Sequence, residues 1–239
     1  MDSRPSSRLG AGATIALGIS YLAVGVGYLL QPEAQRSGTA DQNLLSLADN
    51  ATGFRVVNWS LALGGIVALA AVPAICSAIR ANRDWTAWAR NLGVVGFAVA
   101  TVNAFRTLAL GVIEAGHFAY SVDPANADEI AIINQVAILN DNMRLSLDTD
   151  GWMSFGVVGL FVLLTSVLGT RSGFLPKALG AIGILTSVLY ALVVVGFTSG
   201  NSDLVAIAAA AGGIVLAPVF FIWTGLRLGA EQDGLAGGA

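Results

Sequence analysis

Six long apolar segments constrain the fold of this chain more than any other feature of its sequence. A helix needs about 20 mainly apolar residues to cross roughly 30 Å of bilayer hydrocarbon. Such segments lie approximately at residues 11–30, 54–79, 92–115, 152–170, 175–197 and 204–226. Only 11% of the chain is charged, whereas soluble domains carry roughly 25% charged residues. The sequence therefore predicts an all-α membrane protein, with one six-helix domain over residues 1–228 and a short flexible tail at 229–239.

Basic and acidic residues alternate between the connections of these segments. Arginine and lysine gather before the first segment, between the second and third, and between the fourth and fifth, whereas the other connections are acidic. Short loops rich in Lys and Arg favour the cytoplasmic side of a membrane. We therefore expect both termini to lie in the cytoplasm.

The long external loop, residues 116–151, carries an apolar pattern of its own. Apolar residues recur there at spacings of three and four: Ile132, Val136, Leu139, Met143 and Leu147. This spacing is typical of an amphipathic helix. Two interpretations stay open, namely a surface helix tied to the bundle and a lid over an outward-facing cavity.

Several classes of site are disfavoured by composition. A net charge of −3 without a clustered basic face argues against nucleic acid as a partner. The single cysteine, Cys76, can form no disulfide within the chain, and His117 is the only histidine, so a metal site built from several His and Cys ligands is not expected. We expect no cofactor, and we find no nucleophile and base set that would support catalysis.

Small residues are placed to pack the helices together. Most of the 29 glycines fall within the apolar segments, often in pairs three residues apart or closer. In a bilayer, helices associate through close contact of small residues and a few polar groups. We therefore assign these glycines to packing, and we expect Pro73 and Pro218 to bend their segments locally.

A polar stripe on the third segment is the strongest candidate for a site. It follows a spacing of three and four that places its residues on one helical face, and comprises Asn103, Arg106, Leu110, Glu114 and His117. An ionisable residue at membrane depth costs roughly 2.5–3.5 kcal/mol, so it needs a partner or a function. Arg55 and Asn58 of the second segment lie near the same outer side.

These residues indicate a ligand-binding pocket that opens outward. Further hydrogen bonds or aromatic walls could come from Trp59, Tyr21, Ser20, Trp152 and Tyr190. An alternative is structural, with Arg106 fastening helices through Glu114 or a carbonyl group. Glu114 and His117 also have the Glu-x-x-His spacing of di-iron bundles, but the second motif and the two further glutamates of such sites are missing.

Several stretches resemble the bacterial membrane proteins grouped as domain of unknown function 4386. The most specific is residues 170–180, TRSGFLPKALG, which is similar to a turn of that family with an Arg-Ser-Gly segment, a proline, a basic residue and Leu-Gly. Weaker matches are NATGFR at 50–55, AFR at 104–106 and IWTGL at 222–226. The resemblance implies a six-helix protein of the bacterial cytoplasmic (inner) membrane and implies no activity.

The turn at residues 170–180 also has a physical interpretation. Arg171 and Lys177 bracket it, Gly173 permits backbone angles that other residues avoid, and Pro176 starts the next helix. We interpret it as a structural turn that joins the fourth and fifth segments as an antiparallel hairpin at the cytoplasmic surface.

Three functions remain open from the sequence. The first is a non-enzymatic membrane protein that binds a lipid or another amphipathic small molecule in the outward pocket. The second is an accessory or structural subunit that docks on a partner membrane protein or on a second copy of the chain. The third is a small secondary transporter, although no internal repeat or broken helix pair supports it.

Overall fold

The computed structural model describes residues 8–37, 40–121, 148 and 150–236. In this part of the chain the regular elements are helices. They are α1 (Arg8–Leu30), α2 (Glu33–Ser37), α3 (Ala40–Asp49), α4 (Thr52–Ala78), α5 (Arg83–Ser121), the π-helix η1 (Trp152–Val157), α7 (Val158–Arg171), α8 (Lys177–Ser199), α9 (Ser202–Ala209), the π-helix η2 (Ala210–Leu216) and α10 (Ala217–Ala236).

Six spans in this set are long and apolar enough to cross a membrane. The fourth span joins η1 to α7, and the sixth runs through α9, η2 and α10. The expected all-α architecture with six such helices is therefore confirmed. The predicted amphipathic helix falls on residues 132–147, outside the described part of the chain.

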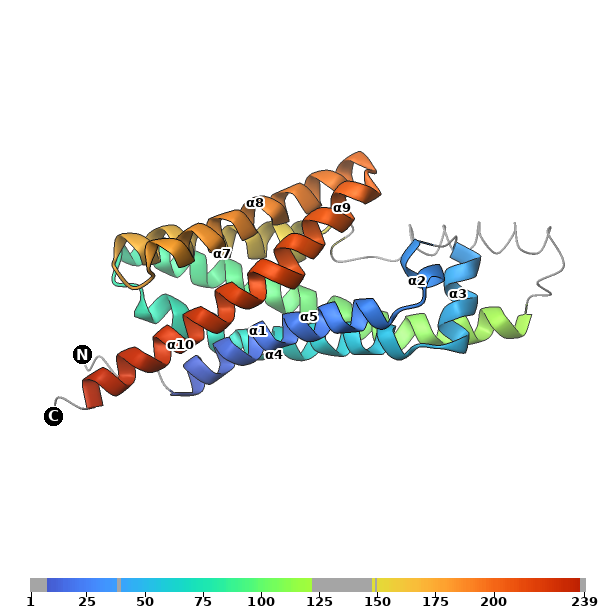
Figure 1. Ribbon diagram of the computed structural model, residues 1–239, viewed down its shortest axis with the longest axis horizontal. Coiled ribbons are helices and arrows are strands. Elements are labelled where there is room, and N and C mark those ends of the chain that lie inside the picture. Colours follow the sequence, from blue (N-terminus) through green and yellow to red (C-terminus); the bar gives the residue numbers. More distant parts are fainter. Residues whose placement is uncertain (1–7, 38–39, 122–147, 149, 237–239) are drawn as a thin grey trace.

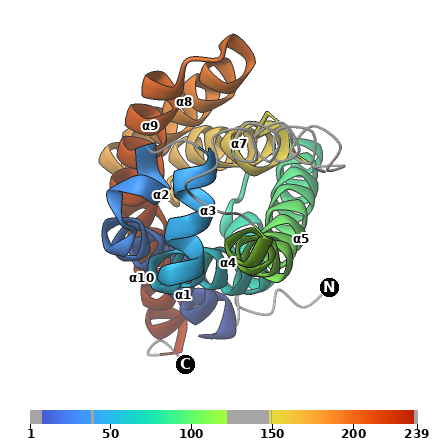
Figure 2. The ribbon, with the colours of Figure 1, turned by 90° about the vertical axis from the view of Figure 1, so that its right-hand side faces the viewer.

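The six spans form a ring. Each span packs against the next in chain order, and the sixth returns to pack against α1, as the end-on view in Figure 2 shows. Figure 1 shows that the start of α1, the end of α10 and the turn between α7 and α8 lie at one end of the bundle. The short helices α2 and α3 lie at the other end. The first and last described residues therefore lie at the same end of the bundle as the basic turn between α7 and α8.

The third span differs most from its prediction. Its helix, α5, begins at Arg83 instead of near Leu92 and continues to Ser121. The polar residues at its start favoured a loop assignment, because the prediction followed the apolar stretch alone. An apolar stretch shows only which residues can lie in the hydrocarbon of a bilayer. The helix itself continues as long as its backbone hydrogen bonds do, so it can extend into polar sequence at either end.

The connection between α1 and α4 holds two short helices that were not predicted from the sequence. Gln35 of α2 joins them, because its Nε2 donates to the carbonyl oxygens of Ser46 at 3.0 Å and Asn50 at 2.8 Å. Asn43 Nδ2 donates back to the Gln35 carbonyl oxygen at 3.0 Å. Helix α3 packs on α5, at the end of the bundle away from the described chain ends (Figure 1).

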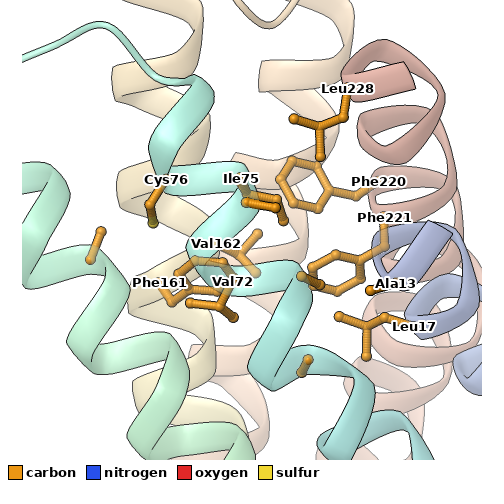
Figure 3. Close-up of a cluster of buried hydrophobic side chains, with 14 of the residues drawn as sticks. Ala13, Leu17, Val72, Ile75, Cys76, Phe161, Val162, Phe220, Phe221 and Leu228 are labelled. Atoms are coloured by element: carbon orange, nitrogen blue, oxygen red, sulfur yellow. The ribbon is translucent and has the colours of Figure 1, made fainter. Parts of the chain in front are cut away.

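Aromatic and aliphatic side chains fill the centre of the bundle (Figure 3). Phe97 meets Phe161 and Phe221 edge-on, each with ring centroids 6.2 Å away. These three rings come from the third, fourth and sixth spans, so spans that are not all neighbours in the chain share one core.

Glycines allow the closest helix contacts, as predicted. A Cβ placed on Gly18 of α1 would lie 3.0 Å from the Pro218 carbonyl oxygen. A Cβ on Gly225 of α10 would lie 2.9 Å from the Ala11 carbonyl oxygen. Since those neighbours are backbone atoms that cannot turn aside, α1 and α10 approach at a distance that side chains would prevent.

The two membrane prolines behave differently. Pro218 is the second residue of α10 and lies two residues after the last residue of the π-helix η2, Leu216. Proline lacks an N–H and its ring clashes with the carbonyl group four residues earlier, and the wider π-helical turn is one way for a helix to accommodate this. Helix α4 continues through Pro73 without such a segment.

The turn between α7 and α8 has the predicted features. Gly173 has a φ of 77°, in the left-handed region. Pro176 precedes the first residue of α8, and Arg171 and Lys177 are exposed. Leu175 folds back into the core and donates its N–H to the Gly169 carbonyl oxygen at 3.0 Å.

Candidate functional site

The predicted polar stripe lies where α4 and α5 run side by side. Two contacts between these antiparallel helices fix their register: Phe54 with Gly111, and Trp59 with Phe105. Asn58 and Arg106 lie between those contacts and therefore at a similar depth. The structure thus brings Asn58 and Arg106 to one level of the bundle.

The polar residues differ in their surroundings. Arg55 is exposed, whereas Asn103 and Arg106 are half-buried. Asn58 is buried, and its Nδ2 donates to the Phe54 carbonyl oxygen of its own helix at 2.9 Å. Arg106 is engaged in an interaction of its own. The predicted role of these residues in ligand binding stays a prediction.

Two members of the predicted site lie at the far end of α5. Glu114 and His117 belong to this helix, but their side chains are outside the described part of the structure. Within the part that is described, no group of three or more His, Cys, Asp and Glu residues is arranged to hold a metal ion.

A groove with a volume of about 550 Å³ lies elsewhere, between the fourth and fifth spans. Ligand pockets in proteins commonly have volumes of about 300–1,000 Å³. The fourth span contributes Trp152, Met153, Gly156, Val157, Gly159, Leu160 and Leu163, and α8 contributes Ser187, Val188, Ala191, Val194 and Val195. The groove therefore has the size of a small-molecule site and walls that are almost entirely apolar.

Small residues from both helices line this groove. Gly159 lets Tyr190 pack against α7, because a Cβ there would lie 3.1 Å from the Tyr190 Cβ. A Cβ on Gly156 would lie 3.5 Å from the Trp152 ring and 3.6 Å from the Val194 side chain, which is ordinary contact. Gly159 thus sets the distance between the helices, while Gly156 and the exposed Ala191 leave the groove open.

The groove offers few polar groups to a ligand. Ser187 donates its hydroxyl proton to the Gly183 carbonyl oxygen of its own helix at 2.9 Å. The indole of Trp152, a side chain that is 58% exposed, is the other polar group of the lining side chains. Such a surface can bind a chain or ring system only through shape and apolar contact, and the indole N–H of Trp152 is the side-chain group that can donate a hydrogen bond at its edge.

A carboxylate fixes the backbone at the Trp152 end of the groove. Asp148 Oδ1 accepts the N–H of Met153 and Oδ2 accepts the N–H of Ser154, both at 2.7 Å. Gly151, with a φ of 70°, makes the turn between them. The first N–H groups of a helix lack partners within it and favour a negative charge nearby, so Asp148 fixes the start of η1.

Sequence reasoning assigned Gly156 and Gly159 to packing alone and did not find the groove. Small residues at spacings of three and four on two adjacent spans, Gly156 and Gly159 facing Ser187 and Ala191, are the signal that could have found it. The same pattern of small residues occurs where two helices pack closely and where they leave an open groove. The relative rotation of the two helices decides which of these structures forms.

The fold and this groove define a multi-pass membrane protein of six helices with an apolar groove on its side. A family model described as "Domain of unknown function (DUF4386)" matches residues 11–225. The chain belongs to this family, as the resemblance at residues 170–180 indicated. Comparison with curated proteins and with solved structures finds no match to the chain.

Proposed function

We propose that this protein binds a lipid or another amphipathic molecule, without catalysis, and that the apolar part of the ligand lies in the groove between η1–α7 and α8. The observation that carries the proposal is the volume of about 550 Å³ bounded by almost wholly apolar walls. Burial of apolar ligand surface stabilises a complex by about 25 cal/mol per Å². Several wall residues, among them Leu160, Val188 and Val195, are exposed at the protein surface, so the groove is open to the lipid phase.

The proposal includes an orientation. Both termini lie in the cytoplasm, and the membrane is the bacterial inner membrane. The exposed basic residues Arg171 and Lys177 support this orientation, because such residues favour the cytoplasmic side. In this arrangement the groove opens in the outer leaflet, with Trp152 at the depth where indole rings commonly meet lipid head groups.

The polar stripe is not needed for this proposal. Asn103 and Arg106 are not among the residues that line the groove. The stripe remains a separate prediction of a polar outward pocket, in which Arg55, Asn58, Glu114 and His117 would also take part.

Native mass spectrometry of the protein in mild detergent, followed by lipid extraction, tests the proposal. We expect one bound amphipathic molecule for each chain. Ala191→Phe fills the groove from α8 and should remove this molecule, because Ala191 is exposed and its replacement disturbs no core contact. Ala181→Phe is the matched control, since Ala181 is also exposed on α8 but does not line the groove.

Two outcomes would contradict the proposal. Equal loss or equal retention of lipid in both variants would show that the groove is not the site. A second polypeptide bound in place of lipid, and released by Ala191→Phe alone, would favour the accessory-subunit function instead.

A further inference from the structure

The groove between η1–α7 and α8 extends along only one half of these helices. In the fourth span (Trp152–Arg171) its lining runs from Trp152 to Leu163, and in α8 it reaches back to Ser187, near the middle of each helix. The stretch from Trp152 to Leu163 is about 16 Å long at 1.5 Å per residue. One leaflet contributes about half of the roughly 30 Å of bilayer hydrocarbon, so the groove has the length of one leaflet.

This length fits an acyl chain and places its head group. The end of the groove at Leu163 and Ser187 lies in the middle of the spans, where a polar head would lose its hydration. At the other end, Trp152 is 58% exposed, and indole rings favour the head-group region of a bilayer. A lipid chain that follows the groove therefore has its head at the Trp152 end.

Two carboxylates lie at the Trp152 end. Asp148 Oδ1 accepts the N–H of Met153, a residue that lines the groove, at 2.7 Å. Asp150 is half-buried and precedes Trp152 by two residues, so their Cα atoms are at most about 7.6 Å apart. This distance is within the Debye length of about 8 Å at physiological ionic strength. Both negative charges therefore act on a head group at this end, whichever way the Asp150 side chain points.

The two helices of the groove bring no positive charge to the same end. Between residues 145 and 226 the only basic residues are Arg171 and Lys177, which belong to the turn at the other end of these helices (Figure 1). The stretch from Trp152 to Arg171 is about 28 Å long. A head group beside Trp152 is thus separated from these basic residues by several Debye lengths.

Helix α5, which packs on η1, does not supply the missing charge either. Gly96 is the residue of α5 that lies against Met153, since a Cβ there would be 3.2 Å from the Met153 carbonyl oxygen. Towards the end that carries α2 and α3, the next basic residue of α5 is Arg106. The stretch from Gly96 to Arg106 is about 15 Å long, and Arg106 is already engaged in an interaction.

We propose that the lipid in the groove carries an amine in its head group and has no net negative charge, as in phosphatidylethanolamine. Its ammonium group is attracted by the carboxylates of Asp148 and Asp150 and by the exposed indole face of Trp152. The same carboxylates repel an anionic head group. This proposal rests on the proposed function of the groove and adds the class of lipid that the groove selects.

Competition between two lipids tests the selection. The protein in mild detergent is mixed with equal amounts of phosphatidylethanolamine and phosphatidylglycerol that have identical acyl chains, and native mass spectrometry compares the bound lipids. The lipid that is bound by the wild-type chain and lost in Ala191→Phe is the ligand of the groove. We expect phosphatidylethanolamine to exceed phosphatidylglycerol in it by about two- to fivefold, the range for one ion pair at a protein surface.

The two proposals fail in different ways. Equal amounts of the two lipids, or an excess of phosphatidylglycerol, would overturn the selection and leave lipid binding in the groove intact. Retention of both lipids in Ala191→Phe at the wild-type level would overturn the groove as the site, and with it the selection.

Substitution of Asp150 tests the cause of the preference. Asp150→Lys reverses a charge beside the groove without changing a lining residue or the hydrogen bonds of Asp148, so it should shift the preference to phosphatidylglycerol. The milder Asp150→Asn should bring the ratio of the two lipids towards one. Asp84→Lys is the matched control, because Asp84 is exposed in the first turn of α5 and does not line the groove. An unchanged ratio in both Asp150 variants, or an equal change in Asp84→Lys, would overturn the proposal.

Salt provides a second, independent measurement on the wild-type chain. Raising ammonium acetate from about 0.15 M to about 1 M shortens the Debye length from about 8 Å to about 3 Å. The preference for phosphatidylethanolamine should then decrease, whereas the total amount of bound lipid should not, because burial of the acyl chain does not depend on charge. A preference of the same size at both salt concentrations would overturn the proposal.

Discussion

Two glycines show how a single residue can matter through its backbone alone. Gly173, in the turn between α7 and α8, and Gly12, in α1, both have open space where a Cβ would be placed. Gly173 has a φ of 77°, whereas Gly12 lies within a regular helix. The two positions therefore have the same free space for a Cβ. They differ only in backbone conformation, which at Gly173 is one that other residues rarely adopt.

Alanine at these two positions should have opposite effects. Gly173→Ala places an L side chain in the left-handed region, at a cost of about 1–2 kcal/mol, and should lower the unfolding midpoint. Gly12→Ala should raise it, because glycine in a helix is less stable than alanine by roughly 0.5–1 kcal/mol. Intrinsic tryptophan fluorescence during heating in detergent measures both, and a shift of the same sign in both variants would contradict the argument.

At the scale of elements, the fourth span shows how a loop can determine the shape of a site. Its first turns form the π-helix η1, in which the N–H of Gly156 reaches back to the Gly151 carbonyl oxygen at 3.1 Å. Trp152, Met153 and Gly156 of this segment line the groove. Asp148 accepts hydrogen bonds from the N–H groups at its start, so a residue outside the groove positions the wall that η1 forms.

Loss of this contact should weaken both the helix and the groove. Asp148→Ala removes two charge-assisted hydrogen bonds and should destabilise the protein by about 1–2 kcal/mol, within the range for helix N-cap residues. We also expect less lipid to be retained in native mass spectrometry. Asp150→Asn removes a charge from the same turn without removing those bonds. If the two variants behave alike, the charge of the turn and not the cap is responsible.

At the scale of the whole molecule, the ring of six spans places charged residues at its two ends. The basic turn of α7 and α8 lies at the same end as the start of α1 and the end of α10 (Figure 1). The exposed Asp203, in the first turn of α9, comes one span later in the chain. If all six spans cross the membrane, their even number places both described chain ends on the same side, which the proposed orientation takes to be the cytoplasm.

Single cysteines test the proposed orientation. A membrane-impermeant maleimide added to whole cells should label Asp203→Cys, whereas Lys177→Cys should react only after the cells are opened. The wild-type chain provides the blank, since its only cysteine, Cys76, is buried. Labelling of Lys177→Cys in intact cells would reverse the orientation and move the groove to the cytoplasmic leaflet.

The sequence by itself determined the six spans and the turn at residues 170–180. Membrane spans can be identified from a sequence because each residue of a spanning helix contributes its own free energy of transfer from water into the bilayer. These contributions do not depend on contacts with distant parts of the chain. The turn is equally local, since the φ of Gly173 and the start of α8 after Pro176 depend on neighbours in the chain. The two short helices α2 and α3 were missed because their stability comes from contacts with each other and with α5, not from an apolar run.

Only the tertiary structure decided where the groove and the buried tyrosine lie. Gly156 and Gly159 look alike in the sequence, yet one opens the groove and the other lets Tyr190 approach α7. Likewise, Phe97 and Phe221 are far apart in the chain, yet their rings meet in the core with centroids 6.2 Å apart. Cavities depend on the rotation and separation of whole helices, and these are set by the sum of many small contacts between them. For that reason a cavity leaves no pattern in the sequence of a single segment.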